Sequence, residues 1–313
     1  VRSDGHIWQF FCYVPLAAWF LYPVVRKKSS QMMFGTLMVV QLLLLVFAME
    51  TFYPGFLGQC PGRLWTHTGN GLNGLLKPSA SMNELKGKME ATGNSLVERY
   101  EILNQVGDRS IDMVGDHQGL VILPQLNYQP RPVFQNYVAN NAYLQDLNLR
   151  YWEAGDTPEL VIQSLDAIDG TLPTQSDSQT ILHLLSHYQR EGSSKHYVLL
   201  SKRSSVADVN PGEEREYGLR YGEATHLDSS RGEVLLARMD VPLNLLGRIR
   251  AFLVKPPLIQ MSTELVDGSV RHYRFNPVTA ERNFLFAPGI QSASQLWDIR
   301  EGKDFPGVVN LTL

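Results

Sequence analysis

The chain has 313 residues, of which 44% are hydrophobic and 19% are charged, and its formal net charge is -3. This balance gives no electrostatic case for binding a nucleic acid, so no nucleic-acid partner is expected. Cys12 and Cys60 lie in very different surroundings, and we do not expect them to form a disulfide. The length allows an N-terminal anchor followed by one large or two ordinary domains.

Two uncharged apolar runs, residues 7–25 and 32–49, flank Arg26, Lys27 and Lys28 near the start of the chain. Each run approaches the ~20 residues that a helix needs to cross a bilayer. We therefore predict two transmembrane helices within residues 1–50, with the lipid bilayer as a partner. Because basic clusters stay cytoplasmic, the long C-terminal region should lie on the other side of the membrane. A cleaved signal peptide and a hairpin buried in a soluble protein are the alternatives.

Residues 51–110 are predicted to form a membrane-proximal connector and a helix. Glycine, proline and aromatic residues up to position 79 are typical of irregular structure. Ser81 and Glu84 then have the spacing of a capping box, which indicates the start of a helix. Apolar residues recur at helical spacing after it, so we expect a helix that is kinked near Gly93 and ends before Gly107.

Residues 111–203 alternate short apolar runs with amphipathic stretches. Strands are predicted at 111–114, 120–123, 159–165 and 197–200, and helices at 134–152 and 178–188. This order predicts a small α/β domain with a parallel or mixed sheet.

Residues 212–313 lack a helical period after the polar segment 204–216. Strands are predicted at 217–225, 233–240, 247–255, 259–266, 270–275 and 283–286. Asp267 and Gly268 form a tight hairpin signal between two of them. The pattern predicts an antiparallel β-sandwich, so the whole chain is expected to be α+β. Because the chain begins with Val1 and ends in an alternating pattern, we interpret it as a fragment with upstream sequence missing.

The segment 126–137, with the sequence LNYQPRPVFQNY, is the most distinctive stretch. Prolines on both sides of Arg131 favour an extended backbone, because the residue before proline avoids the helical region. Arg131, with Tyr128 and Tyr137 nearby in sequence, is a candidate for binding a carboxylate, phosphate or sugar. Alternatively, Arg131 pairs internally with Asp166 or Asp169 and fastens the sheet, which is the role we prefer.

Asp166 and Asp169 follow the predicted strand 159–165 directly. Ligands of α/β sheets bind at the carboxyl ends of strands, so these carboxylates are candidates for acid–base work or for holding a cation. The Asp-x-x-Asp-Gly pattern also forms turns, and we favour this structural interpretation.

Two patterns that contain histidine are candidates for metal sites. Asp112, Asp116 and His117 flank another strand end, but a solvated turn is the stronger interpretation because spacing alone does not make ligands converge. His183 and His187 have the helical spacing of a zinc pair, yet the glutamate of the metalloprotease signature is missing and no third ligand is evident. No metal and no cofactor is therefore predicted.

The stretch N-Y-Q-P-R-P-V-F-Q-N-Y at 127–137 resembles a motif of uncharacterised bacterial polytopic membrane proteins with a glycosyltransferase-like layout. The resemblance runs from about residue 111 to 288 and includes Asn148, Ile168-Asp169-Gly170, Tyr188, Gly247-Arg248-Ile249-Arg250 and Phe284-Leu285-Phe286-Ala287-Pro288. Those proteins often carry S-Y-x-A-Y-T where this chain has residues 136–141, so that Asn140 replaces their second tyrosine.

The resemblance implies a multi-pass protein of the bacterial cytoplasmic membrane with its C-terminal region outside the cytoplasm. We expect that region to bind or position a cell-envelope saccharide or a membrane protein partner. The alternative is an accessory region of a lipid-linked glycosyltransferase, whose catalytic carboxylate would lie upstream of Val1. No residue of this chain is assigned as catalytic, and whether the whole protein is an enzyme is left open.

Overall fold

The computed structural model describes residues 74–194, 196–207, 212–227, 234–253, 258–287, 289–305 and 307–313, together with scattered residues between 32 and 72. The chain divides into two compact units, residues 1–87 and 88–313. In the described part the helices are α4 (Pro78–Arg99), α5 (Gly119–Ile122), α6 (Ala142–Glu153), α7 (Ser178–His187), α8 (Leu245–Leu253) and α9 (Ala293–Arg300). The strands are β1 (Ile111–Val114), β2 (Leu160–Gln163), β3 (Tyr188–Ser193), β4 (Val198–Lys202), β5 (Thr225–His226), β6 (Leu235–Ala237), β7 (Ile259–Leu265), β8 (Val270–Phe275), β9 (Phe284–Ala287) and β10 (Val308–Thr312).

The first sheet has the order β1-β2-β4-β3. Strands β1 and β2 are parallel, with Ile111 opposite Leu160 and Val114 opposite Gln163. Strand β4 runs antiparallel to both β2 and β3. The predicted mixed sheet is therefore confirmed, and its parallel pair brings the carboxyl ends of β1 and β2 to one edge.

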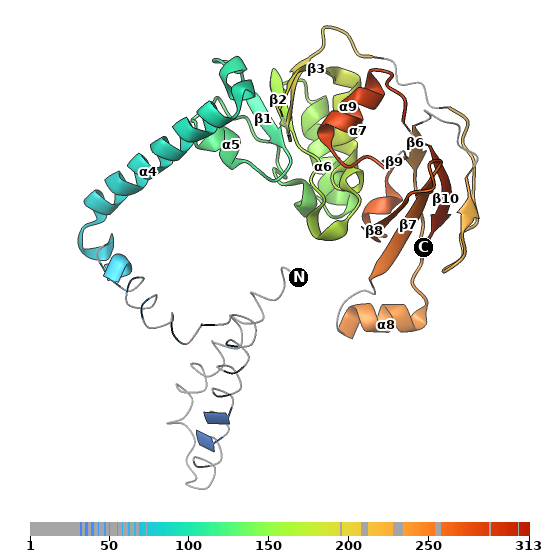
Figure 1. The fold of residues 1–313 in the computed structure, drawn as a ribbon, viewed down its shortest axis with the longest axis horizontal. Coiled ribbons are helices and arrows are strands. Elements are labelled where there is room, and N and C mark those ends of the chain that lie inside the picture. The colour runs from blue at the N-terminus through green and yellow to red at the C-terminus, as the bar shows by residue number, and fades with distance from the viewer. Residues whose placement is uncertain are drawn as a thin grey trace. The chain divides into compact units, whose positions relative to one another are not determined.

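Strands β1 and β2 are buried on both faces, and successive side chains along each strand point to opposite faces of the sheet. Ile111, Met113, Leu160, Ile162 and Leu199 contact a core that includes residues of α5 and the 3-10 turn Glu101–Gln105. Val114, Val161, Val198 and Leu200 contact a second core formed with α7, α9 and Trp152 of α6. Helices α6, α7 and α9 lie on one side of the sheet and α5 on the other (Figure 1).

Helix α4 differs from its prediction at two points. It begins at Pro78, where the missing N–H costs nothing in the first turn, and not at the capping box of Ser81. It also continues through Gly93 without a break. Gly93 is buried, and a Cβ there would clash with the carbonyl of Leu123, so glycine permits close packing and does not mark a kink.

Two other predictions for the first sheet region were wrong. Residues 120–123 form part of α5 and the turn after it, because Leu120 and Val121 both reach the core from a single helical turn. Such a short apolar run has no period that separates a helix from a strand. Helix α6 begins only at Ala142, since Asn141 caps it by accepting the N–H of Leu144 at 3.0 Å. Strand β3 was not predicted, because its exposed positions make it polar.

The second part of the fold has a four-stranded antiparallel sheet, β5-β10-β7-β8, and a two-stranded antiparallel sheet, β6-β9. Strands β7 and β8 form the predicted hairpin, and Gly268 adopts φ 80° in its turn. The two sheets share one core, whose members include Met261, Phe275, Phe284, Phe286 and Val308. The described fold is therefore mixed α/β, with one mixed sheet and two antiparallel sheets.

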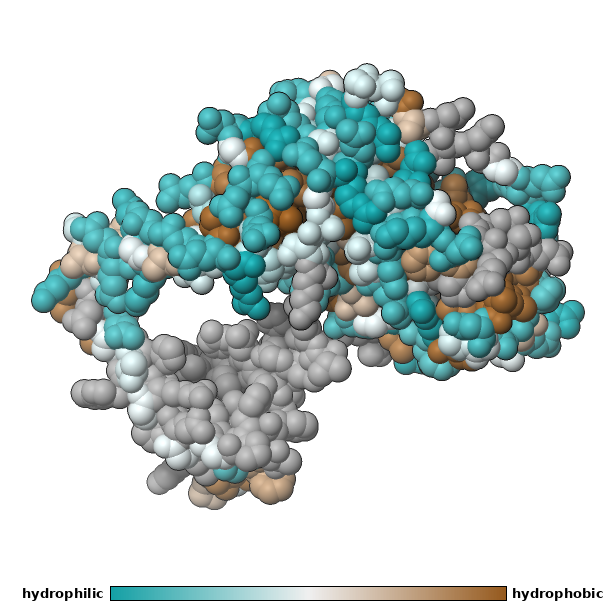
Figure 2. Space-filling model, turned by 45° about the horizontal axis from the view of Figure 1, so that its top comes forward, coloured by the Kyte–Doolittle hydropathy of each residue, from teal (hydrophilic) through white to brown (hydrophobic). Residues whose placement is uncertain are grey.

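Helix α8 replaces the predicted strand 247–255. Asn244 precedes the helix and accepts the N–H of Gly247 at 2.8 Å, which is the N-cap signal that the strand prediction overlooked. Of the predicted strand 217–225 only Thr225 belongs to a strand, β5, and the predicted strand 233–240 shortens to β6. Hydrophilic residues cover most of the described surface visible in Figure 2.

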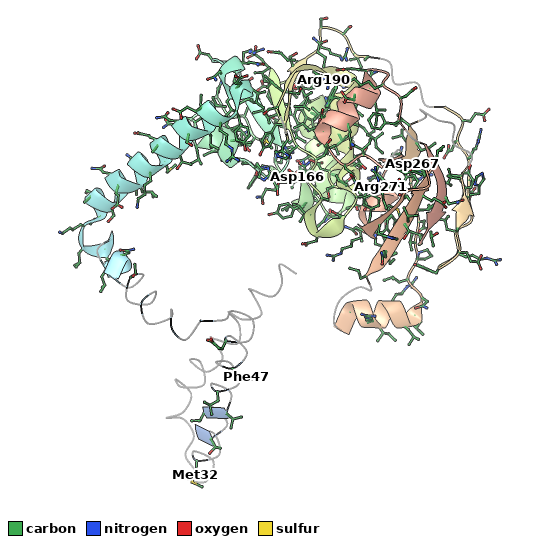
Figure 3. All side chains as sticks on the ribbon, in the orientation of Figure 1. Met32, Phe47, Asp166, Arg190, Asp267 and Arg271 are labelled. Atoms are coloured by element: carbon green, nitrogen blue, oxygen red, sulfur yellow. The ribbon has the colours of Figure 1, made fainter. Side chains whose placement is uncertain are left out.

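Helix α9 returns the chain to the first sheet after β9. Its Trp297 is buried in the core of α7 and β4, and the indole N–H donates to Gln163 Oε1 at 2.7 Å. Arg190 of β3 forms an ion pair with Asp298 at 2.9 Å and another with Glu301 at the end of this helix. Figure 3 shows Arg190 beside α9. Residues beyond position 288 therefore complete the core of the first sheet.

The predicted span 7–25 lies outside the described residues, as do most of span 32–49, Cys12 and Cys60. Among the residues that are described, no helix is both long enough and apolar enough to cross a membrane. Residues 69–72 and 74–76 of the predicted irregular connector are helical. Leucines at positions 72, 75 and 76 have helical spacing and high helix propensity.

Candidate functional site at the ends of two parallel strands

A buried arginine network holds the ends of the parallel strands. Arg131 is 1% exposed, and all five of its N–H groups have acceptors. The side chain donates to Asp112 Oδ2 of β1 at 2.8 Å and to Asp177 Oδ2, just before α7, at 3.3 Å. The other acceptors are Asn136 Oδ1 and the carbonyls of Met113 and Phe134, both at 2.9 Å.

Asn148 of α6 completes this network. Its amide donates to Asp177 Oδ2 at 2.9 Å and to the carbonyl of Val133 at 3.0 Å, and its oxygen accepts the N–H of Val133 at 2.9 Å. Burial raises the pKa of Asp112 and Asp177, and the Arg131 guanidinium opposes that rise. Arg131 thus pairs internally, as preferred from the sequence, but its partners are Asp112 and Asp177 and not Asp166 or Asp169.

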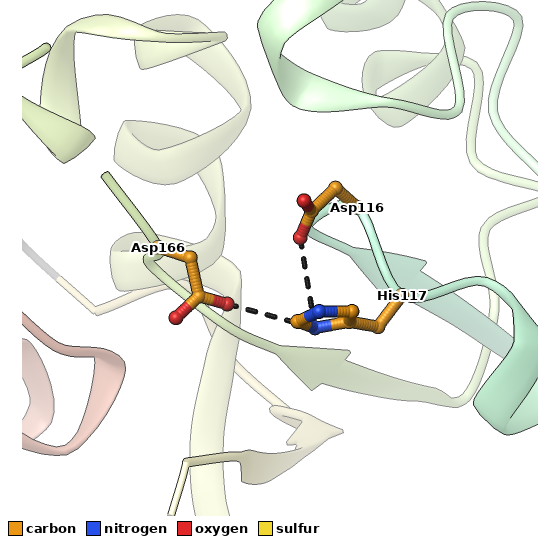
Figure 4. A group of neighbouring side chains, drawn as sticks. All are labelled: Asp116, His117 and Asp166. Carbon is orange, nitrogen blue, oxygen red and sulfur yellow. Dashed lines mark ion pairs between the residues drawn. The ribbon is translucent and has the colours of Figure 1, made fainter. Parts of the chain in front are cut away.

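The exposed part of this edge carries Asp116, His117 and Asp166. Asp116 and His117 follow β1, and Asp166 follows β2, so the parallel pairing brings them together. His117 Nδ1 lies 3.6 Å from Asp116 Oδ1 and 3.6 Å from Asp166 Oδ2. In Figure 4 the imidazole ring lies between the two carboxylates. We call these three residues the strand-end cluster.

Two neighbours position the strand-end cluster. Gly115 allows the strand ends to approach, because a Cβ there would clash with Ser164 Oγ. The Tyr197 hydroxyl contacts His117 Nδ1 at 3.2 Å, and the two rings meet edge to face with centroids 5.9 Å apart. Burial, with smaller contributions from Tyr100 and Asp166, raises the pKa of Tyr197 to about 12, so the hydroxyl stays protonated at neutral pH.

A shallow depression lies beside the cluster. Asp116 and Asp166 line it, together with Ser164, Asn136 and Tyr137. The side chains of Asp166 and Asp116 are 45% and 19% exposed, so both carboxylates are accessible to a ligand. Two carboxylates at one place favour cations and hydroxyl donors and repel anions.

The remaining sequence candidates lie apart from the cluster or serve the fold. Tyr128 is half-buried beside β1, and burial raises its pKa to about 12. Tyr137 lines the depression, and its hydroxyl donates to Gln135 Oε1 at 2.9 Å. Asp169 adopts φ 54° in a turn, where its carboxylate lies 4.0 Å from Arg274. Of the five candidates, only Asp166 belongs to the cluster and only Tyr137 joins it in lining the depression.

His183 and His187 stack on one face of α7, with ring centroids 3.8 Å apart. His187 Nδ1 contacts the carbonyl of His183 at 3.0 Å, and His183 stacks on Trp152. Burial, with smaller contributions from His187 and Lys202, lowers the pKa of His183 to about 4, so His183 is neutral at pH 7. In the described residues, the one group of three metal-ligating side chains is the strand-end cluster, not this pair.

In the sequence, Asp116 and His117 belong to one pattern and Asp166 to another, and nothing in the spacing of the two patterns joins them. The available signal was that both patterns follow predicted strands, which meet at one edge only if the strands are parallel neighbours. Asp177 and Tyr197 gave no sequence signal. Comparison with protein-family models finds no match, and the curated proteins and the solved structures give none either.

Proposed function

We propose that this chain is the C-terminal part of a bacterial membrane protein whose extracytoplasmic region binds an envelope saccharide. The strand-end cluster and its depression form the binding site in this proposal. The observation that carries it is the pair of accessible carboxylates, Asp116 and Asp166, at the carboxyl edge of two parallel strands. Polar ligands of α/β sheets bind outside this edge.

The chemistry of the depression suits a ligand rich in hydroxyl groups. Ionised carboxylates accept short, charge-assisted hydrogen bonds from sugar hydroxyls. Tyr137 lines the same depression, and a tyrosine combines an apolar ring with a polar tip, which suits a ligand ring whose faces are apolar and whose edges are polar. The same carboxylates disfavour phosphate and other anions, so we assign the site to the uncharged part of a saccharide.

Helix α8 supports the membrane-facing part of the proposal. Leu245, Leu246, Ile249 and Phe252 are all exposed, and Phe252 reaches 89%. Their spacing of one, four and seven residues places them on one side of the helix. Arg248 and Arg250 are exposed beside them, so the helix combines apolar and basic side chains as interfacial helices do.

The anchor itself is proposed from the apolar runs 7–25 and 32–49, with the basic loop between them on the cytoplasmic side. We also propose that the two antiparallel sheets form the two layers of the β-sandwich expected from the sequence. Their shared core around Phe284 and Met261 supports this interpretation.

The test is saccharide binding by the full chain in lipid nanodiscs, measured by saturation-transfer NMR with neutral and anionic envelope oligosaccharides. We expect a neutral oligosaccharide to bind and Asp166→Asn to weaken its binding at least about tenfold, as expected for the loss of a charged acceptor. Asp108→Asn is the matched control, because Asp108 is exposed and precedes β1, at the opposite end of the strand. Equal binding by Asp166→Asn and Asp108→Asn would refute the proposed site.

A further inference from the structure

We propose that Asp116, His117 and Asp166 bind a divalent cation of the zinc type. The inference rests on the site of the proposed function and names a cofactor for it. It depends on the geometry of the three ligand atoms, on the charge around them and on a buried hydroxyl group beside them.

Two of the three distances between ligand atoms match tetrahedral coordination. Zinc bonds to histidine nitrogen and carboxylate oxygen are ~2.0–2.2 Å long, so two ligand atoms of a tetrahedral site lie ~3.3–3.6 Å apart. His117 Nδ1 is 3.6 Å from an oxygen of each aspartate, and the three ligand atoms all lie within 4.8 Å of one another. A cation can therefore contact all three after small side-chain rotations.

The two carboxylates of the cluster share one imidazole and have no lysine or arginine partner among the described ion pairs. Other aspartates of the same unit have arginine partners, as Asp112 has Arg131 and Asp298 has Arg190. Two adjacent carboxylates repel each other, and a bound cation removes this cost.

Ser164 provides an independent observation. Its side chain is 1% exposed, and its Oγ has no hydrogen-bond partner in the described structure. The same serine lines the depression together with Asp116 and Asp166. An unpaired buried hydroxyl costs ~1–3 kcal/mol. A water molecule bound to the cation would give Ser164 the missing partner, and three protein ligands plus one water is the arrangement of an open zinc site.

The ligand types select the ion. Calcium and magnesium prefer sites made of oxygen atoms, whereas an imidazole with carboxylates suits zinc or a similar transition metal. Such a cation would leave one position open, and hydroxyl groups of the proposed saccharide can occupy it. His183 and His187 are the competing site, but their rings stack and no carboxylate joins them in a ligand group of the described part.

The experiment uses the full chain in nanodiscs after treatment with a chelator, titrated calorimetrically with zinc chloride alone. We expect one zinc ion to bind, with His117→Ala, Asp116→Asn and Asp166→Asn each lowering the affinity at least about tenfold. The controls Asp108→Asn and His187→Gln should leave the affinity unchanged. X-ray absorption at the zinc edge should report one imidazole ligand.

Three outcomes would overturn the inference: no zinc binding, unchanged affinity in His117→Ala, or two imidazole ligands that His187→Gln removes. The saccharide assay, repeated with and without zinc, shows whether the zinc inference or the proposed saccharide binding is wrong. If the chain binds saccharide but not zinc, only the inference of a cation site is refuted. Zinc binding without any saccharide binding refutes the proposed function and leaves the cation site standing.

Discussion

Replacing Arg131 with alanine should destabilise the chain severely and in a pH-dependent manner. The substitution leaves Asp112 and Asp177 buried without a cation. In the original chain the side chains of Arg131, Asp112 and Asp177 have no exposed surface. Removing one partner of a buried ion pair costs about 3–5 kcal/mol, whereas the free energy of unfolding of a whole domain is about 5–15 kcal/mol. We therefore expect Arg131→Ala to lose a large part of the stability of the second unit.

The pH dependence follows from the carboxylates. Burial already raises the pKa of Asp112 and Asp177, and loss of the guanidinium raises it further. A group with a raised folded-state pKa holds a proton that the unfolded chain releases, so stability falls as pH rises from the ordinary aspartate value of ~3.9 through the folded value. The difference between Arg131→Ala and the original chain should be larger at about pH 8 than at about pH 5.

The assay is urea unfolding of the full chain in nanodiscs, followed by tryptophan fluorescence, with Trp152 and Trp297 buried in the core as reporters. Arg220→Ala is the control, because the Arg220 side chain is 81% exposed and its ion pair with Glu223 should contribute less than about 1 kcal/mol. A loss below about 1 kcal/mol in Arg131→Ala, or a loss independent of pH, would refute the reasoning.

Three further predictions concern the strand-end cluster and the contrast between a buried and an exposed phenylalanine. Gly115→Ala should separate the strand ends, lowering stability by about 1–3 kcal/mol in the same urea assay and weakening zinc binding in calorimetry. Tyr197→Phe removes the hydroxyl that contacts His117 Nδ1, so zinc affinity should rise by a few fold in the same titration, and a tenfold loss would contradict this. Phe284→Ala should cost about 3–5 kcal/mol because Phe284 is fully buried, whereas Phe252→Ser should change unfolding by less than about 0.5 kcal/mol, as measured by urea midpoints.

The spacing of apolar residues and the turn residues predicted correctly those helices and strands that have one clearly buried face or are buried throughout. β1 and β8 have the predicted bounds, and α7 differs by one residue at its end. The prediction of a strand was wrong where a short apolar run was interpreted without the helix-capping residue that precedes it. Asn244 starts a helix in which the apolar residues face outward, so hydrophobicity at 247–255 did not indicate a buried strand.

The candidate site was predictable only in pieces. Asp166 was identified because it follows a strand, and Asp116 and His117 for the same reason. Their convergence depends on β1 and β2 being parallel neighbours, which one sequence does not specify. The partners of Arg131 were wrong because Asp177 lies 46 residues away in a left-handed turn that has no sequence signature of its own.

The Arg131 network has a consequence for the proposed binding site. One guanidinium joins β1, the proline-flanked loop and the start of α7, so these three segments are cross-linked without a covalent bond. We expect the backbone leading to Asp116 to be held in place by these contacts before a ligand binds. If the proposed function is correct, such a surface would lose little conformational entropy on association, and its affinity would be set by the ligand's own ordering and desolvation.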